Sequence, residues 1–166
     1  MAYIPPMKGY KPFYIQATAD LNATDTTAWG MVAYSNPFPA LPDAKEPYKN
    51  NWLDSNGDDE YTAVMHYKPI EFSVKFYVKT FATETDSAVK VLHDQLDSFF
   101  QKIKEGNFYT YDSYTGIGLR MVRYVGYKEE QFRARGNYAM LIFEVQFKCN
   151  DPITRMTISD NKIVQK

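Results

Sequence analysis

Hydrophobic and polar residues alternate with a period of two from Ile70 to Thr80, the most regular pattern in the chain. Because successive side chains of a strand point to opposite faces of a sheet, this alternation predicts a strand with one buried face. The other face carries charged and hydroxyl-bearing side chains, which is typical of an antiparallel sheet with one side in water. The apolar positions of the buried face are Ile70, Phe72, Val74, Phe76 and Val78.

A spacing of three and four residues between apolar positions follows this strand and predicts a helix from about Asp86 to Lys104. Thr83 or Thr85 is expected to cap the first amides of the helix. Gly106 is expected to take the left-handed conformation that ends it. The apolar stripe along the helix consists of Ala88, Val89, Leu92, Leu96, Phe99, Phe100 and Ile103.

Shorter apolar and β-branched segments predict further strands on both sides of the helix. A polar connection from Lys128 to Gly136 is expected to separate the last two of them. The predicted strands are Phe13–Ala19, Ala28–Ser35, Asn107–Asp112, Ile117–Tyr127 and Tyr138–Cys149. Two segments have no clear pattern. In residues 60–68 hydrophobic and polar positions alternate only weakly, and this segment is expected to pair with a nearby strand; the residues after Pro152 are the other segment.

The last strand is apolar on part of its second face as well. Tyr138, Met140 and Ile142 lie between the residues of its buried face, so both sides of this half of the strand are hydrophobic. Such a surface needs a cover, which the helix, another sheet or a neighbouring subunit could supply. These three residues are therefore candidates for a subunit interface.

A long loop is predicted from Asn36 to Asp59, because four prolines in its first half exclude a regular helix or a central strand. Loops of this length are uncommon in compact domains and are usually functional or disordered. This one carries large apolar side chains that disorder alone would not require. Four of them, Phe38, Leu41, Tyr48 and Trp52, are further candidates for a subunit interface.

Composition limits the classes of protein that fit. A chain of 166 residues suits one domain, predicted over 1–152, with a C-terminal tail at 153–166. The 19 Lys and Arg residues are balanced by 20 Asp and Glu, so no overall positive field would attract nucleic acid or a membrane. Cys149 is the only cysteine, which excludes an intrachain disulfide. No signal peptide or membrane-spanning stretch is expected, and the chain is expected to be made in the cytoplasm.

The sequence predicts no catalytic, cofactor-binding or metal-binding residues, and therefore no enzyme. His66 and His93 have no partner at ligand spacing, and Asp54–Glu60 resembles a calcium loop without its turn glycine and closing glutamate. One basic concentration has aromatic residues among its arginines, as a nucleic-acid groove might, but a salt-bridged hairpin edge is favoured. It comprises Arg120, Arg123, Arg133 and Arg135, with Tyr124, Tyr127 and Phe132.

The order of these elements, together with the closing run Phe143–Pro152, resembles the amino-terminal domain of bacteriophage distal tail proteins. In that family a strand like Phe72–Val78 leads into a helix, and an aromatic-x-Cys-x-Asp-Pro tail like Phe147–Pro152 closes the domain. The resemblance covers a little over half of the chain, from Glu60 to Pro152. Many members carry a second β domain, for which the residues after Pro152 are too few, and the loop at 36–59 does not belong to the shared pattern.

The resemblance implies an α+β fold that is mainly β, an antiparallel β-sandwich or barrel-like sheet with one flanking amphipathic helix, related to the tail-tube fold. It also implies a cyclic homo-oligomer, a hexamer, in the virion tail, where it joins the tail tube to the baseplate. DNA would pass through the ring without sequence-specific binding, and no membrane would be involved. The loop at 36–59 could be an arm that reaches a neighbouring subunit.

Two other functions remain open at this point. The same fold would serve a tail-tube or tube-terminator subunit, which differs in its neighbours rather than in its chemistry. A monomeric carbohydrate-binding module belongs to another class, and it would use Trp29, Trp52 and surface tyrosines as platforms for sugar rings.

Overall fold

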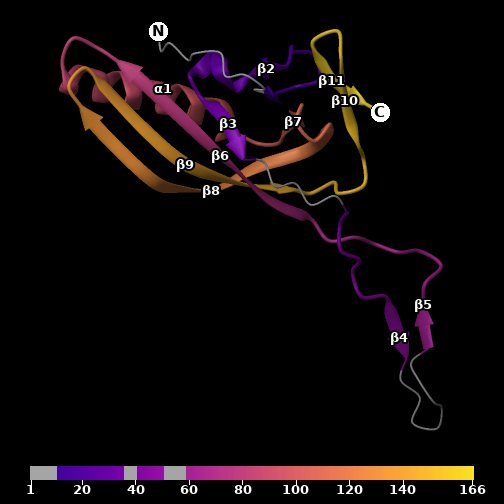
Figure 1. The fold of residues 1–166 in the computed structure, drawn as a ribbon. Coiled ribbons are helices and arrows are strands. Elements are labelled where there is room, and N and C mark those ends of the chain that lie inside the picture. Colours follow the sequence, from indigo (N-terminus) through magenta and orange to yellow (C-terminus); the bar gives the residue numbers. More distant parts are fainter. Residues whose placement is uncertain (1–10, 36–40, 51–58) are drawn as a thin grey trace.

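The computed structural model describes residues 11–35, 41–50 and 59–166. It has the predicted fold class, a mainly β structure with one α-helix. Figure 1 shows a strongly curved sheet with the helix along one side and a narrow arm that leaves the body. The first elements are β1 (Phe13–Gln16), β2 (Thr24–Asp25), the 3-10 helix η1 (Thr26–Trp29), β3 (Val32–Ser35), β4 (Tyr48–Asn50), β5 (Asp59–Tyr61) and β6 (Ile70–Phe81). After them come α1 (Thr85–Ile103), β7 (Phe108–Asp112), β8 (Ile117–Arg135), β9 (Tyr138–Cys149), β10 (Met156–Ser159) and β11 (Lys162–Gln165).

The main sheet has the strand order β2-β1-β7-β8-β9-β6-β3, and every pair in it is antiparallel. β9 is an interior strand, with an unbroken ladder to β6 that runs from Ile70 opposite Cys149 to Phe81 opposite Tyr138. The rings of Phe13 in β1 and Phe76 in β6 contact each other at 6.0 Å between centroids. Three strands separate β1 from β6 in the sheet, so this contact shows that the sheet curls into a barrel-like form.

The core fills the concave side of this sheet, where the alternation of β6 predicts it. All five predicted apolar positions of β6 are buried, and Phe76 and Val78 are fully inaccessible to solvent. Helix α1 packs on the same side, and its buried positions continue the cluster. The hydroxyl of Thr80, also fully buried, donates to the carbonyl of Ala88 at 2.7 Å and so ties β6 to the helix.

Helix α1 lies where it was predicted, but its first turn is held differently. Glu84 is the N-cap residue and makes no side-chain capping hydrogen bond, so the prediction of a threonine cap was wrong. The Thr85 hydroxyl instead donates to the carbonyl of Gly136, in the turn between β8 and β9. A tertiary contact has thus replaced the local cap. Gly106 has φ of 62°, which confirms the left-handed conformation expected after the helix.

β8 is longer than the sequence pattern predicts, because it continues to Arg135 through the expected polar connection. Two shifts in its register with β9, at 124–126 and at 129–131, interrupt the alternation that sequence reasoning relies on. Beyond Val122 this strand also projects past β7, so much of it is in water. Polar residues here mark a solvated strand rather than a loop. Residues 28–29, predicted as strand, belong to η1 instead.

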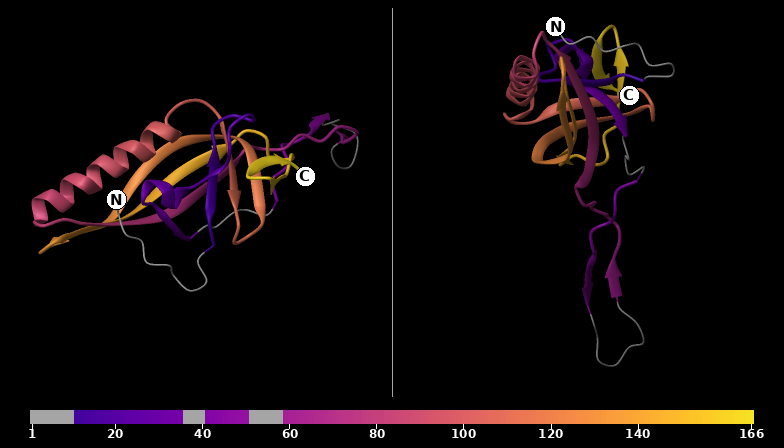
Figure 2. Two further views of the ribbon diagram at one scale, coloured as in Figure 1. Left: turned by 90° about the horizontal axis from the view of Figure 1, so that it is seen from above. Right: turned by 60° about the vertical axis from the view of Figure 1, so that its left-hand side comes forward.

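Residues 41–50 and 59–68 form the arm. Its strand β4 lies where a loop was predicted, and β5 begins at the end of that loop and enters the weakly alternating segment that was expected to pair nearby. β4 and β5 pair with each other, with Tyr48 opposite Tyr61. Nearer the body, an isolated bridge joins Ala44 to Tyr67, and the amides of Lys45 and Lys68 donate across the ribbon at 2.8 Å. Both views in Figure 2 show the arm pointing away from the main sheet. The prolines are compatible with this structure because the ribbon has no central strand.

The segment after Pro152, expected as a terminal tail, forms the hairpin β10–β11, which joins the main sheet. Met156 pairs with Gly118 of β8, and the Gln16 side chain accepts a hydrogen bond from the amide of Ile163 at 2.6 Å. A Cβ atom at position 118 would lie 2.5 Å from the carbonyl oxygen of Met156. Glycine is therefore required for the close approach of β10 to β8.

The substitution Gly118→Ala should displace β10 and lower the free energy of unfolding by about 2 kcal/mol, in the range for overpacking a tight contact. Hydrogen exchange at the β10 and β11 amides should accelerate, which mass spectrometry can measure. Gly126→Ala is the matched control, because its Cβ would meet only the end of the flexible Gln146 side chain, at 3.2 Å. Unchanged exchange in β10 would contradict this account of the contact.

Candidate subunit interfaces

The arm presents large apolar side chains to solvent and has no core of its own. None of residues 41–49 and 60–68 is buried. Leu41 is 81% exposed, and the paired Tyr48 and Tyr61 are 74% and 65% exposed. An isolated two-stranded ribbon is at best marginally stable in water. The arm is therefore a surface that a partner would stabilise. The other two interface candidates of this segment, Phe38 and Trp52, lie outside the described residues.

A second candidate surface lies on the convex, solvent side of the sheet. It consists of three rows of side chains that run across β8, β9 and β6, and we call it the basic face. Residues paired across antiparallel strands share a face, so the ladders define its membership. The rows are Arg135, Tyr138 and Phe81; Arg133, Met140 and Lys79; and Gln131, Ile142 and Tyr77.

Three cations and no carboxylate occur among the nine residues of the basic face. The ammonium of Lys79 lies 4.8 Å from the ring centre of Tyr138 and 5.0 Å from that of Phe81, which is cation–π geometry. The amide oxygen of Gln131, in the orientation that satisfies its polar atoms, accepts from Nε and Nη2 of Arg133 at 2.9 Å. These contacts hold the cations in place without neutralising them.

The next row of side chains, beyond Tyr77 on β6, contains an ion pair. There the ammonium of Lys75 lies 2.6 Å from a carboxylate oxygen of Glu130. The hydrogen bond with Glu130 raises the pKa of Lys75 above its ordinary value. Lys148 and Glu71 form a looser pair, at 3.7 Å, further along the face. Three cations thus stand together, without a carboxylate among them, at the end of the sheet that Tyr138 and Phe81 form.

The predicted candidates Tyr138, Met140 and Ile142 form the middle column of this face and are half-buried. Helix α1 packs on the opposite, concave side, with Ala88 and Leu92 in the core, so it does not cover them. Their role as contacts to another subunit remains a prediction. The alternation of β9 had indicated that both of its faces are apolar. The cations of β6 and β8 could be assigned to the same surface only from the pairing of these strands with β9.

The basic concentration noted in the sequence does not form an aromatic-lined groove. Arg133 and Arg135 point to the convex side, whereas Phe132 pairs with Leu141 on the concave side. Tyr124 and Tyr127 also face the concave side, where their rings contact Phe100 and Phe143. The alternation of β8 therefore separates the arginines from the aromatic rings that a nucleic-acid groove would combine.

Arg120 takes part in a different arrangement, a clasp at the end of β9. Its guanidinium pairs with Asp151, whose other carboxylate oxygen accepts from the amides of Thr154 at 3.1 Å and Ile153 at 3.3 Å. Burial alone would raise the pKa of Asp151, but the hydrogen bonds from Arg120 and from the turn lower it to about 2. Burial raises the pKa of the neighbouring Cys149 thiol to about 11, so this cysteine is an inert core residue.

The substitution Asp151→Asn should lower the free energy of unfolding at neutral pH by about 1.5 kcal/mol, because it removes a charged hydrogen bond to Arg120. The folded pKa of Asp151 lies below its ordinary value of 3.8, so its stabilisation is complete above that value. The contribution is then lost as the pH falls towards 2. Urea unfolding of the two proteins should therefore differ at pH 7 and converge at low pH. A difference that persists unchanged at the lowest pH would contradict this.

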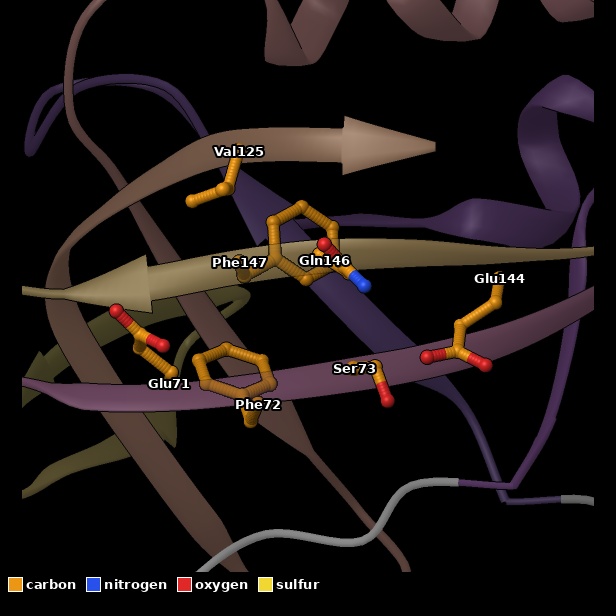
Figure 3. A pocket seen from close by; sticks show the side chains of 7 residues that line it. All are labelled: Glu71, Phe72, Ser73, Val125, Glu144, Gln146 and Phe147. Atoms are coloured by element: carbon orange, nitrogen blue, oxygen red, sulfur yellow. The ribbon is translucent and has the colours of Figure 1, made fainter. Parts of the chain in front are cut away.

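One depression in the described surface combines a serine with two carboxylates. Figure 3 shows this depression, of about 260 Å³, on the convex side, with Glu71 and Glu144 at its two ends and Ser73 and Gln146 between them. Its apolar wall is the edge of the core, formed by Phe72 and Phe147. No histidine or cysteine lines this depression to activate the serine.

Trp29, one of the sugar platforms that the carbohydrate-binding alternative would use, packs against helix α1. Its indole is partly buried and packs on Phe99 at 5.9 Å between ring centres. Within the described part of the chain, no group of three or more His, Cys, Asp or Glu side chains is placed to hold a metal ion. In that same part, no helix is both long and apolar enough to cross a membrane.

Comparisons with known proteins give one informative result. No protein-family model and no curated protein sequence matches the chain. A solved structure does: the crystal structure of the SPP1 Dit protein, described as a paradigm of the hub adsorption apparatus in phages that infect Gram-positive bacteria. The likeness has a TM-score of 0.59 at 14% identity, and it covers 88% of this chain and 52% of the other. The chain thus spans about half the length of that protein and shares the fold of the matching half.

Proposed function

We propose that this chain is a structural subunit of a phage or prophage tail, forming the distal ring that joins the tail tube to the baseplate. The shared fold with the SPP1 Dit protein over 88% of the chain carries the proposal. The sequence resemblance supports it independently, because the Phe147–Pro152 run forms the end of β9 and the clasp at Asp151. A tail subunit works by assembly and requires no catalytic site.

The ring is a cyclic homo-oligomer, with six copies as the resemblance to distal tail proteins implies. Two features support self-assembly: the exposed arm and the partly exposed basic face. They differ in shape and chemistry, so contact between them would be heterologous, and repeated heterologous contacts close into rings when the rotation allows. DNA would pass through the opening without sequence-specific contacts.

Open strand edges are further candidates for the joints. In the described sheet, β8 beyond Val122 pairs only with β9, and β6 from Val78 to Phe81 also pairs only with β9. Unpaired edges can extend a sheet from one chain to the next. A joint at these edges would lie beside the basic face.

Electron microscopy of particles made by the strain that carries the gene tests this function. A gold-labelled antibody against the chain should mark one point, at the end of the tail tube. Label along the whole tube would identify a tube subunit instead, and label at the junction with the capsid would identify a tube terminator. Absence of label from the particles would overturn a virion role altogether.

A further inference from the structure

We propose that the convex side of β8, β9 and β6 binds the phosphate backbone of duplex DNA without reading its sequence. The inference rests on the proposed function in that DNA passes through the ring. It adds the surface of the subunit that the DNA contacts, and the charges that hold the two together.

The convex side of these three strands is positively charged, although the whole chain is not. Seven cations and three carboxylates belong to it by strand pairing and by the ion pair of Lys75 with Glu130. The cations are Lys75, Lys79, Arg123, Lys128, Arg133, Arg135 and Lys148, and the carboxylates are Glu71, Glu130 and Glu144. The whole chain has a net charge of −1, so positive charge is concentrated on this side. A local field of this sign attracts polyanions.

The cations near Tyr138 are not neutralised. Arg133 and Arg135 are exposed, and neither forms an ion pair with a residue that the structure describes. The salt-bridged hairpin edge that the sequence favoured is therefore not observed for these two arginines. The ring of Tyr138 lies 4.8 Å from the Lys79 ammonium, and a cation–π contact leaves the charge of that ammonium intact. All three charges can act on an anion.

A second group of cations lies at the other end of the same side. Arg123 is paired with Lys148 across β8 and β9, and Lys148 makes only a loose contact with Glu71, at 3.7 Å. Tyr138 and Lys148 are ten residues apart on β9. Measured along the strand this is about 33 Å, and one turn of B-DNA is about 34 Å long. A duplex that follows the strands would therefore present phosphates to both groups of cations.

The surface suits a duplex better than a single strand. Single strands are held largely by aromatic rings on which the bases stack. The rings of Tyr124 and Tyr127 are on the concave side, where they contact Phe100 and Phe143. Phosphate contacts need cations and hydrogen-bond donors but no such rings. Three paired strands are also broader than the helix or two-stranded ribbon that the major groove admits. Binding should therefore be independent of sequence and sensitive to salt.

Fluorescence anisotropy of a labelled duplex of about 20 base pairs, roughly two helical turns, tests the contact with the full chain. The unchanged protein should bind in the micromolar range at about 50 mM salt, with equal affinity for two unrelated sequences. Arg133→Gln with Arg135→Gln should weaken binding about tenfold. The slope of log K against log salt concentration should fall by about two, because two phosphate contacts are lost.

Variants elsewhere separate this contact from a general effect of charge. Arg123→Gln, at the other end of the convex side, should weaken binding as well and lower the salt slope by about one. Lys90→Gln with Lys102→Gln is the matched control, because both lysines are exposed on α1, which packs on the concave side. This control should change the affinity less than about twofold. Circular dichroism should show the same fold for all variants.

Three results would overturn the inference. They are an unchanged chain that does not bind the duplex, an arginine variant that binds it as tightly, and a control variant that weakens binding equally. DNA and a second copy would compete for the basic face, so sedimentation velocity is measured on the same samples. Loss of self-association by the arginine variant, with DNA binding unchanged, would assign the face to a second copy instead. None of these results decides the tail function, because labelled particles report it independently of how the isolated chain behaves.

Discussion

Replacing Phe76 by alanine is expected to lower the free energy of unfolding by about 4 kcal/mol, near the middle of the range for Phe→Ala changes in a core. Its side chain is fully buried, and its ring contacts those of Phe13, Phe99 and Phe143 at centroid distances of 6.0, 5.2 and 5.7 Å. These rings come from β1, α1 and β9. The cavity left by Phe76→Ala would therefore weaken three contacts of β6 together: those with β1 across the barrel, with helix α1 and with the neighbouring strand β9.

Thermal or urea unfolding followed by circular dichroism measures this loss, which corresponds to a fall in Tm of roughly 10 °C for a chain of this size. Phe81→Ala is the control on the same strand, because its side chain is 46% exposed on the convex side. That variant should change the unfolding free energy by less than about 1 kcal/mol. Equal losses for the two variants would show that Phe76 is not at the centre of the core.

The double substitution Tyr48→Ser with Tyr61→Ser is expected to weaken self-association by about a thousandfold. Buried tyrosines at the centre of an interface often contribute 2 kcal/mol or more each, and every 1.4 kcal/mol is a factor of ten. The two rings are paired across the arm and contribute nothing to the monomer's core. The monomer's unfolding free energy should therefore stay within about 0.5 kcal/mol of its original value.

Sedimentation equilibrium gives the association constant, and urea unfolding gives the stability of the monomer. Tyr114→Ser is the control, because Tyr114 is 75% exposed but lies in the turn before β8, far from the arm in sequence. Its removal should not affect association. If the arm variant assembles as well as the unchanged chain, the arm is not a subunit contact, whichever surface it was expected to meet.

The sequence predicts best those strands and helices that bury one face in the core and expose the other to solvent. β6, α1 and β9 have that character, and their observed limits differ from the predicted ones by at most one residue. β8 was cut short because its register shifts disturb the period of two, and because residues 128–135 are solvated. The cap by Thr83 or Thr85 was predicted wrongly: Glu84 is the N-cap residue, and the Thr85 hydroxyl donates to Gly136, which is distant in sequence.

The candidate surfaces were less accessible to sequence reasoning. Exposed tyrosines in a proline-rich segment indicated a surface for a partner, but the pairing of Tyr48 with Tyr61 depends on contacts across the arm. The apolar column of β9 was visible from its alternation. Its flanking cations, Lys79 and Arg133, lie more than fifty residues apart in the chain, and only the sheet register places them side by side.

Strand β6 has a mechanical consequence for assembly. One end of this twelve-residue strand continues from the arm, and its other end contributes Tyr77, Lys79 and Phe81 to the basic face. A continuous ladder with β9 keeps the strand from flexing between these ends. In any assembly that uses both surfaces, the angle between successive copies would follow from the length and twist of β6. Inserting or deleting a pair of residues there would alter how many copies close a circle, while a longer arm would leave that number unchanged.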